Sequence, residues 1–174
     1  MNTAIAERIE AYMLRPNLTE QKMKSVQNIK RFADELGIEL SRHDSLNYYF
    51  QYDSALIHLG LEQDREGLES IVIQSLVAGQ VPRSPELTAW LLATNLELPL
   101  GAFGFKSGTI VLRQSLAAAQ DLSLEQFRAN FFTIAILADQ FDDQIVARFG
   151  GKRSAELMRE HDQQDFAWFG EPEA

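Results

Sequence analysis

Cysteine is absent from this 174-residue chain, and histidine is scarce. Without cysteine there are no disulfides, no thiolate nucleophiles and no zinc–thiolate sites. The three histidines, His43, His58 and His161, stand far apart, and none has a second histidine or a carboxylate at a spacing typical of a metal site. The sequence therefore predicts neither thiol chemistry nor a bound metal.

Basic residues are also few, with 16 Lys and Arg against 25 Asp and Glu, so the formal net charge is -9. Proteins that bind nucleic acid normally present a basic stripe to the phosphate backbone. We therefore expect no nucleic-acid partner. An acidic chain remains compatible with a basic or apolar protein partner.

Long apolar runs are missing as well. None approaches the roughly 20 residues that span a bilayer, and Glu7 and Arg8 place charges where a secretory signal needs its apolar segment. We expect a cytoplasmic protein with no membrane partner. Apolar residues make up 45% of the chain and charged residues 24%, which are normal globular values.

Motifs for phosphate binding and nucleophilic catalysis are absent too. The glycines at 104 and 108 lie in a predicted hairpin, not in the strand-to-helix turn of a nucleophile elbow. Residues 151–154 follow a helix and lack the upstream glycine of a phosphate loop. We predict no catalytic residue and no cofactor, and we expect that the protein is not an enzyme.

The stretch 84–151 carries the strongest pattern in the chain, and it predicts a helix, a hairpin and a long helix. Ser84 is a good N-cap and is followed by proline. Residues 100–105 and 109–113 are expected to pair across a turn at Ser107-Gly108. A capping box at Ser123 opens a helix whose apolar residues recur every three or four positions up to residue 149.

The N-terminal half predicts two helices and three strands. Helical spacing covers residues 3–14 and again a segment from about Thr19 to the stop at Gly37. From 46 to 77 the apolar period changes to two, which indicates strands. The order α-α-β-β-β-α-β-β-α predicts an α+β fold with an antiparallel sheet of about five strands packed with helices.

We predict one domain over residues 1–174. Its core covers about 19–150, with a helical extension at 1–18 and an aromatic, acidic tail at 152–174.

The segment from Leu92 to Gly104, followed by the strand 108–113 and a capped long helix, resembles the YbjN family and its type III secretion chaperone-like relatives. The similarity covers roughly residues 19–149. The N-terminal helix and the aromatic tail are similar to a cyanobacterial branch of YbjN-like proteins. The resemblance implies a non-enzymatic, secretion chaperone-like α+β domain, often dimeric, that holds or regulates other proteins.

Apolar residues are also predicted on the sheet face that points away from the helices. Strand alternation places Val72, Leu76, Val111 and part of the Tyr48/Phe50 pair there. Such a face is usually more polar in an isolated monomer. We expect the N-terminal helix, the tail, a second copy or a client protein to cover it.

Our leading hypothesis is a non-enzymatic protein-binding module, chaperone-like or regulatory, that forms a homodimer and binds a protein client. The candidate partner-binding residues are Val72, Trp90, Phe103, Phe105, Val111, Phe166, Trp168 and Phe169. For the last three, docking on the chain's own body and docking on a partner both stay open.

Two alternatives come from other classes. Asp139, Asp142 and Asp143 share one helix face, where carboxylates can bind a cation or act with a histidine in a small-molecule- or metal-binding protein or enzyme. The chain can also be a structural subunit of a larger assembly.

Overall fold

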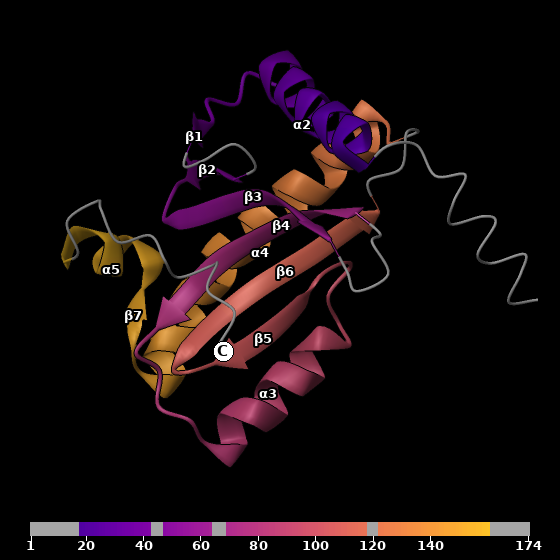
Figure 1. The fold of residues 1–174 in the computed structure, drawn as a ribbon. Coiled ribbons are helices and arrows are strands. Elements are labelled where there is room, and N and C mark those ends of the chain that lie inside the picture. The colour runs from indigo at the N-terminus through magenta and orange to yellow at the C-terminus, as the bar shows by residue number, and fades with distance from the viewer. Residues whose placement is uncertain (1–17, 43–46, 64–68, 118–121, 161–174) are drawn as a thin grey trace, which may run out of the picture.

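The computed structural model describes residues 18–42, 47–63, 69–117 and 122–160 (Figure 1). The predicted helix at 3–14 and the aromatic residues Phe166, Trp168 and Phe169 lie outside these ranges. Four helices are described, namely α2 (Leu18–Glu35), α3 (Pro85–Asn95), α4 (Leu124–Phe149) and α5 (Ser154–Glu160). Within the described residues, no helix combines the length and apolar character needed to cross a bilayer.

Capping side chains begin α3 and α4 where the sequence predicts. The Ser84 hydroxyl accepts the Leu87 N–H at 3.0 Å. The Ser123 hydroxyl accepts the Gln126 N–H at 3.1 Å, and the Gln126 side chain accepts the Ser123 N–H at 3.0 Å. Each bond satisfies a backbone N–H that has no partner within its helix. Both predicted helix starts are therefore confirmed.

The described residues form seven strands, namely β1 (Ser41–Arg42), β2 (Asn47–Tyr52), β3 (Ala55–Gln63), β4 (Glu69–Gly79), β5 (Ala102–Lys106), β6 (Thr109–Ala117) and β7 (Lys152–Arg153). They form one antiparallel sheet in the order β1-β2-β3-β4-β6-β5, with β7 added beside the end of β4. The α+β fold class is confirmed. The short strands β1 and β7 and the helix α5 were not predicted.

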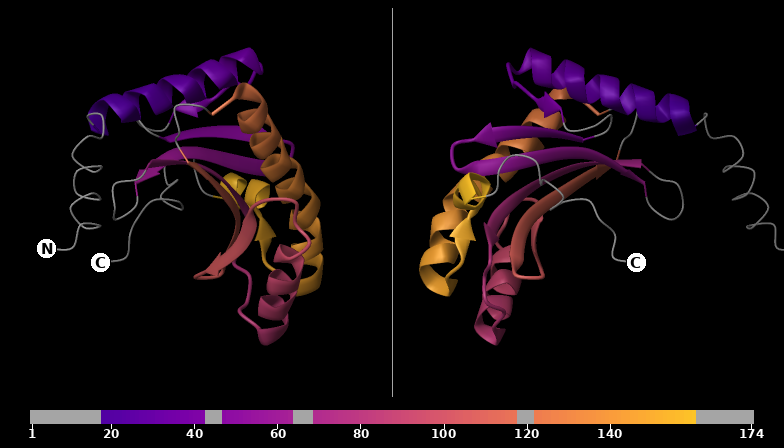
Figure 2. Two further views of the ribbon diagram at one scale, coloured as in Figure 1. Left: turned by 90° about the vertical axis from the view of Figure 1, so that its right-hand side faces the viewer. Right: turned by 60° about the vertical axis from the view of Figure 1, so that its left-hand side comes forward.

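One face of the sheet packs against α4, and α2 lies across the N-terminal end of that helix (Figure 2). The register places Ile57, Leu59 and Ile73 on this face, and all three are fully buried with Phe127 and Phe131 of α4.

Tyr48 and Phe50 both point toward the helices, because they pair with Leu59 and Ile57. The prediction that part of this pair lies on the opposite face was wrong. Tyr49, between them, takes that place opposite His58.

On the face away from α4, Leu56, Leu76 and Val111 lie side by side across β3, β4 and β6, as predicted for the last two. Leu56 and Leu76 are each only 4% exposed. The element that lies against β3 and β4 at this end is α5, whose Leu157 is buried (Figure 1). Part of the segment predicted as a tail is thus built into the fold.

Two glycines allow the chain to turn from α4 into β7. Gly150 and Gly151 have φ values of 79° and 91°, which favour glycine. A Cβ at Gly151 would lie 2.7 Å from the Gly79 carbonyl oxygen, so only glycine lets the chain approach β4 this closely.

Candidate protein-binding site

A groove runs between α3 and the β5–β6 hairpin. Its cavity has a volume of about 600 Å³. Apolar side chains from both elements line it, together with a few polar groups: Val81, Arg83, Thr88, Leu91, Leu92, Asn95, Phe103 and Phe105. Two of the predicted partner residues, Phe103 and Phe105, therefore belong to one concave surface.

Two leucines on α3 are unusually exposed. Leu92 is 63% exposed and Leu96, at the C-terminal end of the helix, is 89% exposed. They are four residues apart and so share one helix face. Among the described residues, the only other large apolar side chain with comparable exposure is Ile136 on α4, at 41%. The exposed apolar surface is thus concentrated beside the groove.

Strand β5 forms an edge of the sheet next to this groove. The Asn95 side chain covers part of that edge: its Oδ1 accepts the Phe103 N–H at 2.6 Å, and its Nδ2 donates to the Phe103 carbonyl at 3.1 Å. Because backbone groups alternate in direction along a strand, the N–H and C=O of Phe105 point the same way. Among the described residues, none forms a hydrogen bond with that second pair.

An aromatic cluster forms the base on which α3 rests. The Trp90 ring lies 6.4 Å from Phe103, 5.9 Å from Phe141 and 5.5 Å from Phe149. Phe103 is only 7% exposed. Trp90 and Phe103 therefore fix the helix against β5 and α4, whereas Phe105 is more accessible at the groove wall.

The structure divides the other predicted partner residues. Val72 and Val111 lie on the opposite face of the sheet, where Val72 is fully buried and Val111 is half-buried. They do not join the α3/β5 groove. Phe166, Trp168 and Phe169 lie outside the described residues.

The same opposite face carries a polar network that the sequence did not reveal. The His58 ring bonds Asn47 Oδ1 through Nε2 at 2.7 Å and Gln74 through Nδ1 at 3.2 Å. The next strand supplies Arg113, which bonds both carboxylate oxygens of Glu62 at 2.9 and 2.6 Å. This charge-assisted hydrogen bond is the main reason that the pKa of Glu62 is lowered. His58 is thus a buried structural residue.

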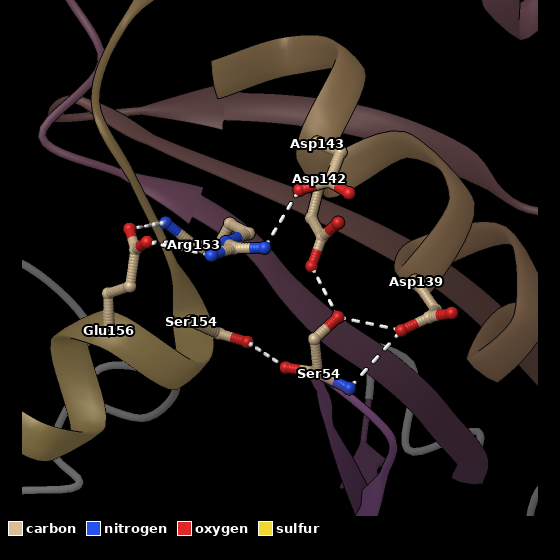
Figure 3. Close-up of polar contacts among 7 residues, drawn as sticks. All are labelled: Ser54, Asp139, Asp142, Asp143, Arg153, Ser154 and Glu156. Carbon is tan, nitrogen blue, oxygen red and sulfur yellow. Dashed lines mark hydrogen bonds and ion pairs between the residues drawn. The ribbon is translucent and has the colours of Figure 1, made fainter. Parts of the chain in front are cut away.

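The predicted acidic face of α4 points toward the β2–β3 turn (Figure 3). The Ser54 hydroxyl oxygen lies 2.6 Å from Asp139 Oδ1 and 2.6 Å from Asp142 Oδ2, and the Ser54 N–H donates to Asp139 Oδ1 at 3.2 Å. Asp143 instead pairs with Arg153 at 2.8 Å. Within the described part of the chain, no three potential ligand side chains are placed to hold a metal ion.

Burial perturbs one of these carboxyls. Asp142 is 2% exposed, and its desolvation raises the pKa of the side chain. Hydrogen bonds with Ser54 and with the Asp143 backbone offset part of this rise in pKa, and the charges of Asp143 and Asp139 add to it. Hydrogen bonding to Arg153 lowers the pKa of Glu156. Hydrogen bonds from Ser54 thus connect the β2–β3 turn to α4, and the ion pairs of Arg153 with Asp143 and Glu156 connect α4 to the start of α5.

The family model of YbjN, described as a putative bacterial sensory transduction regulator, matches residues 25–147. No curated protein matches the chain at a significant level.

Two solved structures resemble the fold. A chain in the HopA1–SchA chaperone–effector complex superposes with a TM-score of 0.54 at 14% identity, covering 74% of this chain and 99% of that one. A chain in the ExsC–ExsE complex gives a TM-score of 0.52 at 19% identity, covering 74% and 96%. At these identities the similarity concerns the fold.

Proposed function

The chain belongs to the YbjN family, and from that premise we propose that it is a non-enzymatic, chaperone-like or regulatory module that binds a segment of another protein in the α3/β5 groove. The fold shared with chains from the HopA1–SchA chaperone–effector complex and from the ExsC–ExsE complex supports a protein partner. The observation that carries the proposal is the position of Leu92 and Leu96, both strongly exposed, beside the edge strand β5. On that strand the N–H and C=O of Phe105 form no hydrogen bond with any residue that the structure describes.

An extended partner segment would bind by strand addition. Its backbone would pair with the N–H and C=O of Phe105, and its alternate side chains would enter the groove between α3 and β5. Covering each exposed leucine contributes about 1.5–3 kcal/mol. The Asn95 side chain already hydrogen-bonds the N–H and C=O of Phe103, so the added strand would pair only with the end of β5 nearest the hairpin turn.

We further propose a homodimer in the cytoplasm, with Phe166, Trp168 and Phe169 as a peptide that docks either on the chain's own body or on the partner. Light scattering on the full chain and on a variant ending at residue 160 tests whether the protein is a homodimer. A strict monomer in both cases would exclude the dimer.

Affinity capture from the native host tests the binding site, with wild type, Leu92→Glu and Ile136→Glu compared. Ile136 is the matched control because it is the exposed apolar residue on α4, outside the groove. We expect the Leu92 variant to lose partners that the Ile136 variant keeps. Identical partners for both variants would contradict the assignment of the groove.

A further inference from the structure

The contact between Ser54 and α4 brings two carboxyl oxygens to one hydroxyl. Asp139 Oδ1 and Asp142 Oδ2 each lie 2.6 Å from the Ser54 Oγ (Figure 3). Oxygen–oxygen distances this short need a hydrogen between the atoms. A serine hydroxyl has only one hydrogen to donate, although its oxygen can also accept. One of the two carboxyls must therefore supply a hydrogen of its own.

The backbone identifies which carboxyl this is. The Ser54 N–H donates to Asp139 Oδ1, the same oxygen that contacts the hydroxyl. Because Asp139 Oδ1 accepts this N–H, it carries no hydrogen of its own. The hydrogen between Asp139 Oδ1 and the Ser54 hydroxyl oxygen therefore belongs to the hydroxyl. The remaining 2.6 Å contact then needs a hydrogen from Asp142, which is 2% exposed, whereas Asp139 is partly exposed. Burial favours the uncharged form of a carboxyl.

We propose that the Asp142 carboxyl is a proton-binding site that keeps its proton above the pH at which an exposed aspartate loses it. The hydrogen bond made by this proton holds the β2–β3 turn, and through it the β7–α5 segment, against α4. The link to α5 runs through Ser54, whose carbonyl accepts the Ser154 hydroxyl at 3.0 Å. Release of the proton leaves two anions competing for one hydroxyl hydrogen.

Within the part of the chain that the structure describes, the other charged groups around the site form ion pairs or face solvent. On α4, Asp143 is exposed and pairs with Arg153 of β7, which also pairs with Glu156 of α5 at 2.9 Å. Asp53, in the turn, is exposed. Among the described residues, no cation forms an ion pair with the Asp142 carboxylate. The neighbouring acids therefore favour retention of the proton.

Loss of the proton would loosen α5, since the Ser54–Ser154 bond connects it to the β2–β3 turn. The buried Leu157 of α5 and the strand residues Leu56 and Leu76 would then become more accessible. This site lies away from the α3/β5 groove and does not depend on the function proposed for it.

Carboxyl ¹³C NMR on the full chain tests the proton site directly. We expect the Asp142 resonance to titrate above 3.8, the usual value for aspartate. In Asp139→Asn the amide oxygen keeps accepting from Ser54 while the neighbouring charge is gone, so the Asp142 midpoint should move down. An Asp142 midpoint at or below 3.8 in the wild type would overturn the proposal.

Hydrogen exchange of the α5 amides tests the mechanical link. In Asp142→Asn the side-chain amide donates to Ser54 at every pH. We expect wild-type protection of α5 to fall below that of this variant as the pH rises, and to match it at low pH. Equal protection in the two proteins at every pH would show that the proton does not fasten α5. If the Asp142→Asn variant fails to fold, Asp139→Asn gives the same comparison, with loss of α5 protection shifted to lower pH.

Discussion

At the scale of single residues, Gly60 makes room for the polar network on the outer face of the sheet. A Cβ at this position would lie 2.7 Å from His58 Cε1 and 2.8 Å from Asn47 Oδ1. These atoms belong to the two side chains that hydrogen-bond at 2.7 Å. The glycine thus allows the His58 ring to lie over its own strand and reach Asn47.

Gly60→Ala should therefore displace the His58 ring, break its bond with Asn47 and destabilise the protein by about 1–3 kcal/mol. Gly104→Ala is the matched control, since a Cβ there meets only Val111 Cγ2 at an ordinary 3.5 Å. Urea unfolding of both variants measures the difference. Equal midpoints would mean that the close approach at Gly60 is relieved without cost.

Asn95 protects the β5 edge, because its side chain imitates a neighbouring strand at Phe103. Asn95→Ala should cost about 1–3 kcal/mol and free a second outward-facing backbone pair, so self-association should increase. Light scattering and urea unfolding measure the two effects. Asn130→Ala, which removes one exposed bond within α4, should leave self-association unchanged and shift stability by no more than about 0.5 kcal/mol.

At the scale of elements, α3 combines a buried side with an exposed one. Leu87 and Leu91 pack into the core, while Leu92 and Leu96 remain at the surface. Leu92→Glu together with Leu96→Glu should leave the unfolding free energy within about 1 kcal/mol of wild type, because neither leucine is buried.

The same double variant should lower the apparent mass of any homodimer that uses this helix, as measured by sedimentation. A dimer that persists unchanged would place the subunit interface elsewhere.

Local patterns predicted most of the elements. The caps at Ser84 and Ser123, the period-two run over β3 and the stop at Gly37 gave boundaries within a few residues of those observed. The strands β1 and β7 escaped because two residues are too short to show any period. Helix α5 was not predicted because its seven residues make only about two turns, too few to show helical spacing, and its packing on β3 and β4 is not visible in the sequence.

The site was less predictable than the fold. Phe105 was expected to contact a partner, and the structure places it on the groove wall; its role there stays a prediction. Exposed Leu92 and Leu96 were missed, since a helix that is apolar on all sides does not show which side is covered. The Asp139/Asp142 pair was noticed as an acidic face, but its partner Ser54 is 85 residues away from Asp139 in the sequence.

At the scale of the whole molecule, the raised pKa of Asp142 makes stability depend on pH. The folded state holds this proton more tightly than the unfolded chain, so the contribution is fully present below 3.8 and is lost as the pH rises through the raised pKa. Glu62, whose pKa is lowered, acts in the opposite sense: its contribution is present above 4.5 and is lost as the pH falls.

Wild type should therefore lose stability relative to Asp142→Asn by up to about 1.4 kcal/mol per pH unit within the titration range. Thermal unfolding of both proteins from pH 4 upward, in otherwise identical buffer, measures the difference. Parallel curves at all pH values would show that Asp142 titrates normally in the folded protein.

The pairing of β7 with β4 also has a consequence for synthesis on the ribosome. Ala78 and Gly79 meet their neighbours Arg153 and Lys152 only after roughly seventy further residues have been translated. At about 5–20 residues per second, that interval lasts several seconds. During this interval the backbone at the end of β4 lacks its β7 partner, so slow translation or a premature stop would favour aggregation there.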